Sequence, residues 1–414
     1  MSWKDDIGAP LNTRHIDVID GIRALGVLIV MWFHVWQQSW LMPAVQLPFL
    51  SFLGIDQYNP DIVRRSGYLL VDLMMLISAF CLFLPHARNM LEGEKLPSWK
   101  QFYKKRAVRI LPSYYLCVIG LFFLFALPTN AYNGNTSFMW RDLVSHLTFT
   151  QMYQVDTFVS TNLNVVLWTV AIEVQFYLIF PFIAKWFRKN PGLTYIGMVA
   201  VSLAYIHLYA LRQPYLMMTV NRMPTFLCVF ANGMMAAYAY VAIANKYTRE
   251  KAVGYVSMGV SILCIAVFAA IAPAAIAGDK QAWQLENRYL LSGLFTVFIL
   301  STALSAKAYR VLYSNRLMRF LAAISYNLYI WHQWIAANFK QWRIPGWEGD
   351  ALPNQTGDLA WQWKYTLIVY SVSIASAALI TYGFEKPMAK LLLKDPKLRL
   401  PAAPPSEAEA GIGE

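Results

Sequence analysis

The chain has 414 residues, of which 57% are hydrophobic, 15% aromatic and 14% charged. Soluble domains carry about 25% charged residues, so this composition excludes an ordinary soluble globular protein and also a disordered chain. A net charge of +12 would suggest nucleic acid in a soluble protein, but the sequence shows no helix-turn-helix, RNP or zinc-finger pattern, so we expect no nucleic-acid partner.

Ten apolar segments are long enough to span a membrane, since a bilayer core about 30 Å thick needs about 20 mostly apolar residues. In chain order they are 18–38, 66–86, 110–128, 163–184, 192–211, 223–244, 252–275, 289–306, 320–339 and 364–384. They predict an all-α, polytopic membrane helix bundle formed by residues 1–400 as a single domain. The Pro-, Ala- and Glu-rich residues 401–414 are predicted to be a disordered cytoplasmic tail.

The distribution of basic residues predicts the orientation. Ten spans place both termini on one side of the membrane. With the termini inside, the inner segments hold 25 of the 35 Lys and Arg residues. Because cytoplasmic loops are enriched in Lys and Arg, both termini are predicted to be cytoplasmic, and this excess accounts for the net charge without nucleic acid.

Four ionisable residues lie well inside the predicted spans, away from the span ends: His34, Asp72, Glu173 and His332. At 1.5 Å per residue, all four lie about 17–21 Å above the inner surface, which suggests one internal polar cavity. Two imidazoles and two carboxylates can supply a general base with an orienting acid, or can form a polar network that holds helices together. No His-rich spacing indicates a metal site.

Two groups of charged residues lie near the inner ends of the spans. Arg106 and Arg109 are three residues apart and share a helix face, with Lys105 beside them. Guanidinium groups at a membrane mouth suit phosphates, although they also serve as topology anchors. Asp20 and Arg23 are also three residues apart and are expected to neutralise each other.

The predicted outer loop 340–363 is rich in tryptophan. Its tryptophans are Trp342, Trp347, Trp361 and Trp363. Two interpretations are open, an aromatic belt at the membrane interface or a surface on which sugars stack.

Six short segments follow one another from residue 19 to residue 387. They are Ile19–Leu25 with His34, Val71–Phe80, Tyr103–Tyr115, Trp168–Leu178, Ile324–His332 and Phe384–Pro387. They resemble, in the same order, the motifs of the acyltransferase 3 family of integral-membrane acyltransferases, which include "VDLFFVLSGF", "WSLSVEEQFYL" and "ISYSLYLWH". Three residues depart from those motifs: Ala79 replaces a glycine, Thr169 replaces a serine and Val174 replaces an acidic residue.

The resemblance implies acyl transfer to a hydroxyl group in a cell membrane, with the bacterial cytoplasmic membrane as the expected location. The implied donor is acetyl-CoA or another acyl-CoA, the implied acceptor is a cell-surface glycan or related carbohydrate, and no metal is implied. His34 is then the catalytic histidine and Arg23 its motif partner, while Arg106 and Arg109 belong to the acyl-donor motif. The other motif positions are Asp20, Glu173, Tyr329 and His332.

These residues support a hypothesis for the mechanism. Phosphates of acyl-CoA dock near Arg106, Arg109 and Lys105, and His34 removes the proton of the acceptor hydroxyl. Glu173 or Asp72 would fix the imidazole tautomer. A covalent acyl-histidine intermediate is also possible.

Two other classes of protein are compatible with the spans. One is a proton-coupled transporter of a small polar or sugar-like solute, and the other is a non-catalytic glycan-binding scaffold. The transporter is disfavoured because no pair of Gly/Pro-broken helices occurs in corresponding halves and the basic motif lies at one mouth only.

Overall fold

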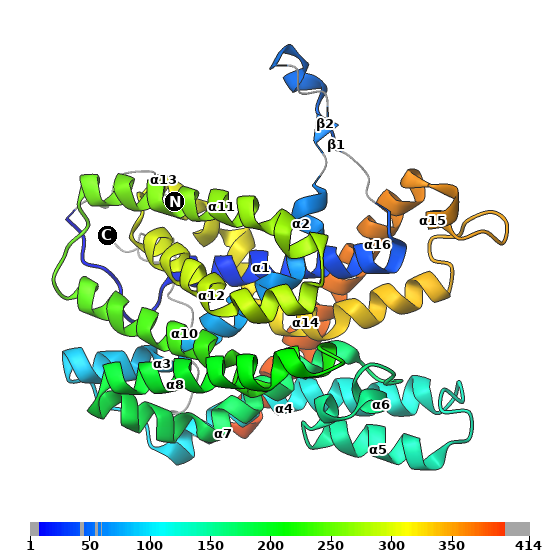
Figure 1. Cartoon of the computed structure of the whole chain (residues 1–414), viewed down its shortest axis with the longest axis horizontal. Helices are drawn as coiled ribbons and strands as arrows, with labels where there is room; N and C mark the ends of the chain where they lie inside the picture. Colours follow the sequence, from blue (N-terminus) through cyan, green and yellow to red (C-terminus); the bar gives the residue numbers. More distant parts are fainter. Residues whose placement is uncertain (1–7, 42–44, 54–56, 59, 394–414) are drawn as a thin grey trace, which may run out of the picture.

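The computed structural model describes residues 8–41, 45–53, 57–58 and 60–393. The predicted tail 401–414 lies outside the described residues. Helices dominate the described part of the chain, which confirms the all-α fold class. Its strand pair is short: β1 (Val45–Gln46) pairs antiparallel with β2 (Gln57–Tyr58), beyond the small helix α2 (Asp61–Arg65) (Figure 1).

Nine helical stretches of the described residues are long and apolar enough to cross a membrane, so this is a multi-pass membrane protein. Each overlaps one of the predicted segments. Their main helices are α1 (Asp17–Ser39), α3 (Leu70–Glu92), α4 (Trp99–Leu121), α7 (Trp168–Lys189), α8 (Pro191–Leu208), α10 (Met223–Ala244), α11 (Lys251–Ala277), α12 (Lys280–Leu304) and α16 (Leu359–Ile380).

The remaining predicted segment, 320–339, the ninth in chain order, falls within α14 (Arg316–Gln341), a helix of 26 residues. This helix is not among the nine apolar stretches. Its middle carries Asn327, His332 and Gln333, which lower its hydropathy. The helix therefore lies where the sequence predicts it, while the number of ten spans stays a prediction.

The ends of the long helices alternate between two faces of the bundle. We call the face where α1 begins the N-terminal face; α3 ends there and α13 (Lys307–Ser314) lies there, at the left of Figure 1. At the opposite face lie α5 (Thr136–Leu147), α6 (Val155–Phe158) and α15 (Pro353–Thr356), together at the right of Figure 1. The predicted placement of the termini in the cytoplasm stays a prediction.

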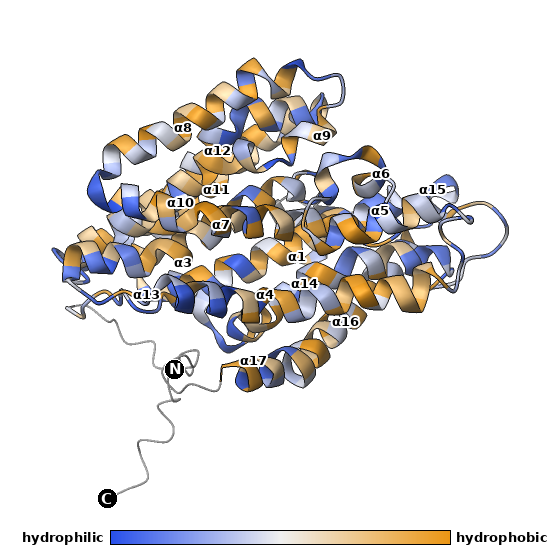
Figure 2. Cartoon of the chain, turned by 90° about the horizontal axis from the view of Figure 1, so that it is seen from below, coloured by the Kyte–Doolittle hydropathy of each residue, from blue (hydrophilic) through white to orange (hydrophobic). Residues whose placement is uncertain are grey.

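The core of the bundle is formed by α3 and α10. The most apolar windows of these stretches are 78% and 72% buried, compared with 22% for α8 and for α11. A Cβ atom at Gly233 of α10 would lie 2.3 Å from the carbonyl oxygen of Leu76, so this close approach of α3 requires glycine. Apolar residues dominate the exposed α8 (Figure 2), as expected for a helix that faces lipid.

α1 packs against α3, α13 and α14. A Cβ atom at Gly21 would lie 1.7 Å from the carbonyl oxygen of Tyr313 in α13, so α13 presses directly on the backbone of α1. From α16, the Tyr370 hydroxyl donates to the carbonyl oxygen of Leu28 at 2.7 Å. These contacts fix the rotation of α1, and with it the direction of the side chains that it presents to α14.

Residues 127–164 form a compact structure at the opposite face, which we call the cap. It contains α5, the 3-10 turn η4 (Gln151–Tyr153) and α6. The side chain of Asn135 accepts the backbone N–H of Phe138 at 2.9 Å and so caps α5. Two hydroxyls of α4 tie the cap to the bundle: Tyr114 donates to the carbonyl oxygen of His146 at 2.8 Å and Tyr115 to that of Leu147 at 3.1 Å.

The tryptophans of segment 340–363 divide into two pairs. Trp342 and Trp363 are 46% and 41% exposed. In contrast, Trp361 is buried, stacks on Tyr365 with ring centroids 4.8 Å apart, and contacts Trp347 edge-on. Both the interfacial belt and the sugar-stacking surface stay predictions for the exposed pair.

Candidate active site

His34 on α1 and His332 on α14 are in direct contact. The Nε2 atom of His332 lies 2.9 Å from Nδ1 of His34, and the ring centroids are 4.9 Å apart. His332 is buried, and its other nitrogen, Nδ1, lies 2.7 Å from the carbonyl oxygen of Tyr329 and 3.2 Å from that of Leu328. The structure thus brings together two of the four ionisable residues for which the sequence predicts a shared depth.

These contacts assign the tautomers of the two neutral rings. A carbonyl oxygen only accepts hydrogen bonds, so Nδ1 of His332 carries its proton and donates it. The Nε2 atom of His332 is then an acceptor, and Nδ1 of His34 must donate to it. The lone pair on Nε2 of His34 is therefore the one left available to take a proton.

The contact at Nδ1 of His34 differs from the sequence prediction, which placed Glu173 or Asp72 there. Asp72 is buried on α3 and binds α12 instead: its Oδ2 lies 3.1 Å from Nε of Arg288, and Gln284 donates to its Oδ1 at 3.1 Å. No hydrogen bond or ion pair joins Asp72 to His34 among the described residues. The prediction that all four groups share one cavity stays a prediction.

Arg288 is a buried residue that the sequence analysis missed. The eighth predicted span begins at residue 289, whereas α12 begins at Lys280. Asp279 marks that start, because its side chain accepts the backbone N–H groups of Gln281 and Ala282 at 2.9 and 3.0 Å. Recognising this N-cap would have placed Arg288 about two turns inside the helix.

The predicted basic residues Arg23, Arg106 and Arg109, which we call the basic cluster, lie nearer the N-terminal face. Arg23 donates to Sγ of Cys81 at 3.3 Å and pairs with Asp20 at 3.5 Å. The Arg106 guanidinium lies 6.0 Å from the ring centroid of Tyr177. Both arginines interact electrostatically with Glu173, and so does Tyr329, one turn before His332.

Further contacts extend this cluster to the other motif segments. The hydroxyl groups of Ser78 and Tyr177 are 3.3 Å apart. Asn327 donates to Oε2 of Glu385 at 2.6 Å, and Glu385 in turn interacts electrostatically with Arg109. All six motif segments therefore contribute side chains to one region of the bundle, although they are distributed along most of the chain.

Two further predicted residues have distinct surroundings. Tyr329 is buried one turn before His332 and shares a side-chain hydrogen bond with Thr169 of α7. Lys105 is half-buried on α4 beside Arg106, but no contact of its side chain with the cluster is described. Arg23 and His34 are eleven residues apart on α1, so about 16 Å separates the basic cluster from the histidine pair along the helix axis.

A cavity of about 250 Å³ lies at the N-terminal face between α1, α12 and α13. Its lining includes His15, Lys307 and Ser314 but none of the predicted site residues. No group of three or more His, Cys, Asp or Glu side chains within the described residues could hold a metal ion.

The comparisons with known proteins decide the family. The model of the acyltransferase domain of the acyltransferase 3 family matches residues 16–382. The chain belongs to the acyltransferase 3 family. The match contains the histidine pair and the basic cluster, and it ends three residues before Glu385.

Curated relatives of this acyltransferase are distant. O-acetyltransferase OatA of Staphylococcus aureus (strain NCTC 8325 / PS 47) is 25% identical over 355 residues, which cover 81% of this chain and 53% of the relative. A second S. aureus protein (strain COL), provisionally named an O-acetyltransferase, is 23% identical over 342 residues, covering 77% of this chain and 50% of the relative. The chain thus spans about half the length of the curated relatives it matches, and no solved structure matches it.

Proposed function

We propose that this acyltransferase is a membrane O-acetyltransferase that moves an acetyl group from acetyl-CoA to a hydroxyl of a cell-surface carbohydrate, with His34 as general base. The names of the distant relatives favour O-acetyl transfer. The observation that carries the catalytic role is the 2.9 Å contact between the two histidines, because it leaves Nε2 of His34 with a lone pair. The proposed location is the cytoplasmic membrane of a bacterium.

In the proposed reaction, the acceptor hydroxyl donates its proton to Nε2 of His34 while its oxygen attacks the thioester carbonyl. The tetrahedral intermediate collapses, the carbon–sulfur bond breaks, and the proton on His34 passes to the leaving sulfur. The products are the acetyl ester and free CoA, and His34 returns to its neutral form. His332 holds the imidazole of His34 in the tautomer that this reaction needs, in the role that an aspartate has in a catalytic triad.

The donor is proposed to bind along α1. Its phosphates contact Arg106 and Arg109, and its pantetheine arm runs between the helices toward His34, about 16 Å further along the α1 axis. Guanidinium groups suit phosphates because their planar donors can bind two oxygens at once. Glu173, which faces Arg23 and Arg106, balances part of the positive charge when no donor is bound. Asp72 is proposed to stabilise the bundle through Arg288.

The decisive experiment incubates the purified protein in lipid nanodiscs with [¹⁴C]acetyl-CoA and a panel of carbohydrate acceptors. We expect a radiolabelled carbohydrate ester that forms with the wild-type protein and is absent without it. Uptake of a solute into proteoliposomes without ester formation would instead support a transporter. Binding of carbohydrate without turnover would support a scaffold.

Replacing Arg106 with alanine is expected to raise the KM for acetyl-CoA about tenfold and to change kcat much less. A phosphate contact is made in the ground state and in the transition state alike, so its loss weakens binding without slowing the chemical step. Steady-state kinetics with varied acetyl-CoA measure both constants. Lys104→Ala is the matched control, because Lys104 is an exposed cation on the same helix. An unchanged KM in Arg106→Ala would remove this arginine from the donor site.

A further inference from the structure

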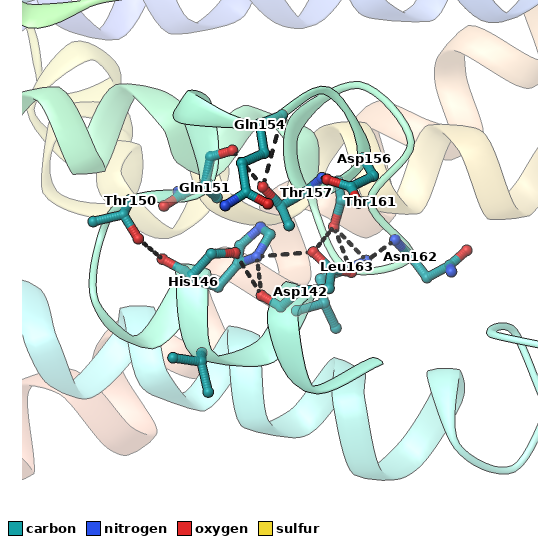
Figure 3. Close-up of polar contacts among 12 residues, drawn as sticks. Asp142, His146, Thr150, Gln151, Gln154, Asp156, Thr157, Thr161, Asn162 and Leu163 are labelled. Atoms are coloured by element: carbon teal, nitrogen blue, oxygen red, sulfur yellow. Dashed lines mark hydrogen bonds and ion pairs between the residues drawn. The ribbon is translucent and has the colours of Figure 1, made fainter. Parts of the chain in front are cut away.

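Asp142 organises the cap. Its side chain is buried, and its carboxylate accepts hydrogen bonds from the hydroxyls of Tyr132 and Thr161 and from the backbone N–H of Asn162, at 2.9 to 3.1 Å. Burial and the neighbouring carboxylate both raise the pKa of Tyr132, so the phenol stays protonated and donates. Figure 3 shows Thr161 and Asn162 beside the aspartate. One carboxylate thus joins α5 to the segments before and after it.

His146, one turn after Asp142, is also buried. Its Nδ1 lies 2.8 Å from the carbonyl oxygen of Asp142 and 3.2 Å from Oδ1 of the same residue. Both partners are acceptors, so Nδ1 carries the proton in the neutral ring and Nε2 presents a lone pair. This Nε2 has no hydrogen-bond partner among the described residues.

A second acceptor without a partner belongs to Gln151. Its side chain is buried, its Nε2 donates weakly to Tyr114 at 3.5 Å, and its Oε1 has no partner in the described part of the chain. In Figure 3, Gln151 and Gln154 lie on the side of the His146 ring that faces away from Asp142. Gln154 is exposed, so this region lies near the surface of the cap.

The two acceptors define the chemistry of a ligand. Buried polar atoms are paired in nearly all proteins, and an unpaired acceptor is unfavourable. An ionised carboxylate or a phosphodiester offers no donor to either atom, and no metal-binding group of three ligands occurs within the described residues. Neighbouring hydroxyl groups of a neutral carbohydrate can donate to both atoms at once.

The cap is connected to the histidine pair through a short segment. Thr161 and Asn162 bind Asp142, and two residues after Asn162 the side chain of Asn164 donates to the carbonyl oxygen of Ile330 at 2.7 Å. Ile330 precedes His332 by two residues on α14. Three residues of extended chain span at most about 10 Å, so the edge of the cap at Asn162 lies within a few sugar units of α14, the helix that carries His332.

We propose that His146 and Gln151 form a hydroxyl-binding subsite for a second sugar unit of the acceptor, so that this acyltransferase prefers oligomeric or polymeric carbohydrate to a single sugar. This inference rests on the proposed function, because it assigns the acceptor of that reaction. The sugar that is acetylated lies at His34, and a neighbouring unit of the same chain donates hydroxyls to Nε2 of His146 and Oε1 of Gln151.

The test measures binding without a donor, using chitotetraose and N-acetylglucosamine as probes of the full chain in nanodiscs. We expect chitotetraose to slow hydrogen–deuterium exchange of residues 142–162, and N-acetylglucosamine at the same concentration to have a much smaller effect. Gln151→Met removes one acceptor and keeps a side chain of similar length. It should raise the Kd for chitotetraose about fivefold, the change expected when one neutral hydrogen bond is lost. Gln154→Ala is the matched control and should leave this Kd unchanged or lower it.

His146→Phe is the second variant, because it removes the lone pair and keeps a planar ring. It should weaken chitotetraose binding while the exchange pattern of the free bundle stays like that of the wild type. Equal binding of the tetramer and the monomer, no protection by either, or an unchanged Kd in Gln151→Met would overturn the subsite; the two acceptors would then hold water only.

Failure of this subsite can be told apart from failure of the proposed function. His34→Ala should keep chitotetraose protection at the cap while it loses acetyl transfer. Absence of transfer by the wild type, with protection of the cap intact, would reject the enzyme mechanism and keep the binding site. Transfer by the wild type without any protection of the cap would reject the binding site and keep the enzyme mechanism.

Discussion

Replacing His34 with alanine is expected to lower kcat for acetyl transfer about 10³-fold, because a positioned general base contributes roughly 10²–10⁴ in rate. His332→Leu should lower kcat about 10²-fold, since it removes the acceptor for the Nδ1 proton of His34 and frees the imidazole to adopt the other tautomer. The double variant should be no slower than His34→Ala alone, because the rate losses caused by replacing residues that act as one unit do not add. The rate of transfer from labelled acetyl-CoA, at saturating concentrations of donor and acceptor, gives kcat for all three variants.

Two controls distinguish this role of His332 from simple packing. His332→Gln supplies an amide oxygen that can accept from His34, so it should recover part of the rate that His332→Leu loses. The ¹⁵N shifts of labelled histidine report the tautomer directly, and the chain has six histidines to assign. In the wild type, Nδ1 of His34 should be protonated, and in His332→Leu the two tautomers should mix. A double variant clearly slower than His34→Ala, or an Nε2-protonated His34 in the wild type, would contradict the proposed pair.

Asp72→Asn is expected to destabilise the bundle by about 3–5 kcal/mol, because it leaves the Arg288 charge buried without its partner. Both side chains are fully buried, and their contact is 3.1 Å long. Arg288 is held further by the carbonyl oxygen of Val220 at 2.7 Å and the hydroxyl of Thr225 at 2.5 Å. The charge therefore cannot move to solvent without disrupting α10 and α12. Thermal unfolding in detergent, followed by tryptophan fluorescence, measures the loss.

The double variant Asp72→Asn/Arg288→Met tests what Asp72 does. It removes both charges, so it should regain most of the stability that Asp72→Asn loses. If the role of Asp72 is structural, the double variant should also regain acetyl transfer. A stable double variant that stays inactive would support a catalytic role for Asp72, as predicted from the sequence. Glu286→Gln is a control for the loss of one negative charge, because Glu286 is an exposed carboxylate on α12, the helix that carries Arg288.

The positions of the long helices could be predicted from the sequence because an apolar stretch of sufficient length has few alternatives in a membrane. Even α14 lies where the sequence places it. In the predicted outer loop between the third and fourth spans, the sequence analysis did not predict a helix. Residues 136–147 form α5, which Asn135 caps, so the local sequence held a start signal for a helix that the search for apolar spans did not use.

The partners of the ionisable residues were harder to predict. Depth along the membrane normal follows from counting residues, and it grouped His34 with His332, Asp72 and Glu173. Depth is one coordinate only, however. The direction in which each side chain points depends on how its helix is rotated, and that is set by packing such as Gly21 against Tyr313 and Gly233 against Leu76. For this reason the contact between residues 34 and 332, which are 298 positions apart, is visible only in the folded bundle.

The polar middle of α14 has a consequence for how the protein is made. A segment with Asn327, His332 and Gln333 at its centre gains less from entering lipid than its neighbours do. Its stable placement therefore depends on α1 and α16, against which it packs, and α16 is synthesised after it. The proposed general base on α1 consequently meets His332 in a stable bundle only after α16 has been synthesised, and a half-inserted chain has no oriented base with which to react with the cell's thioesters.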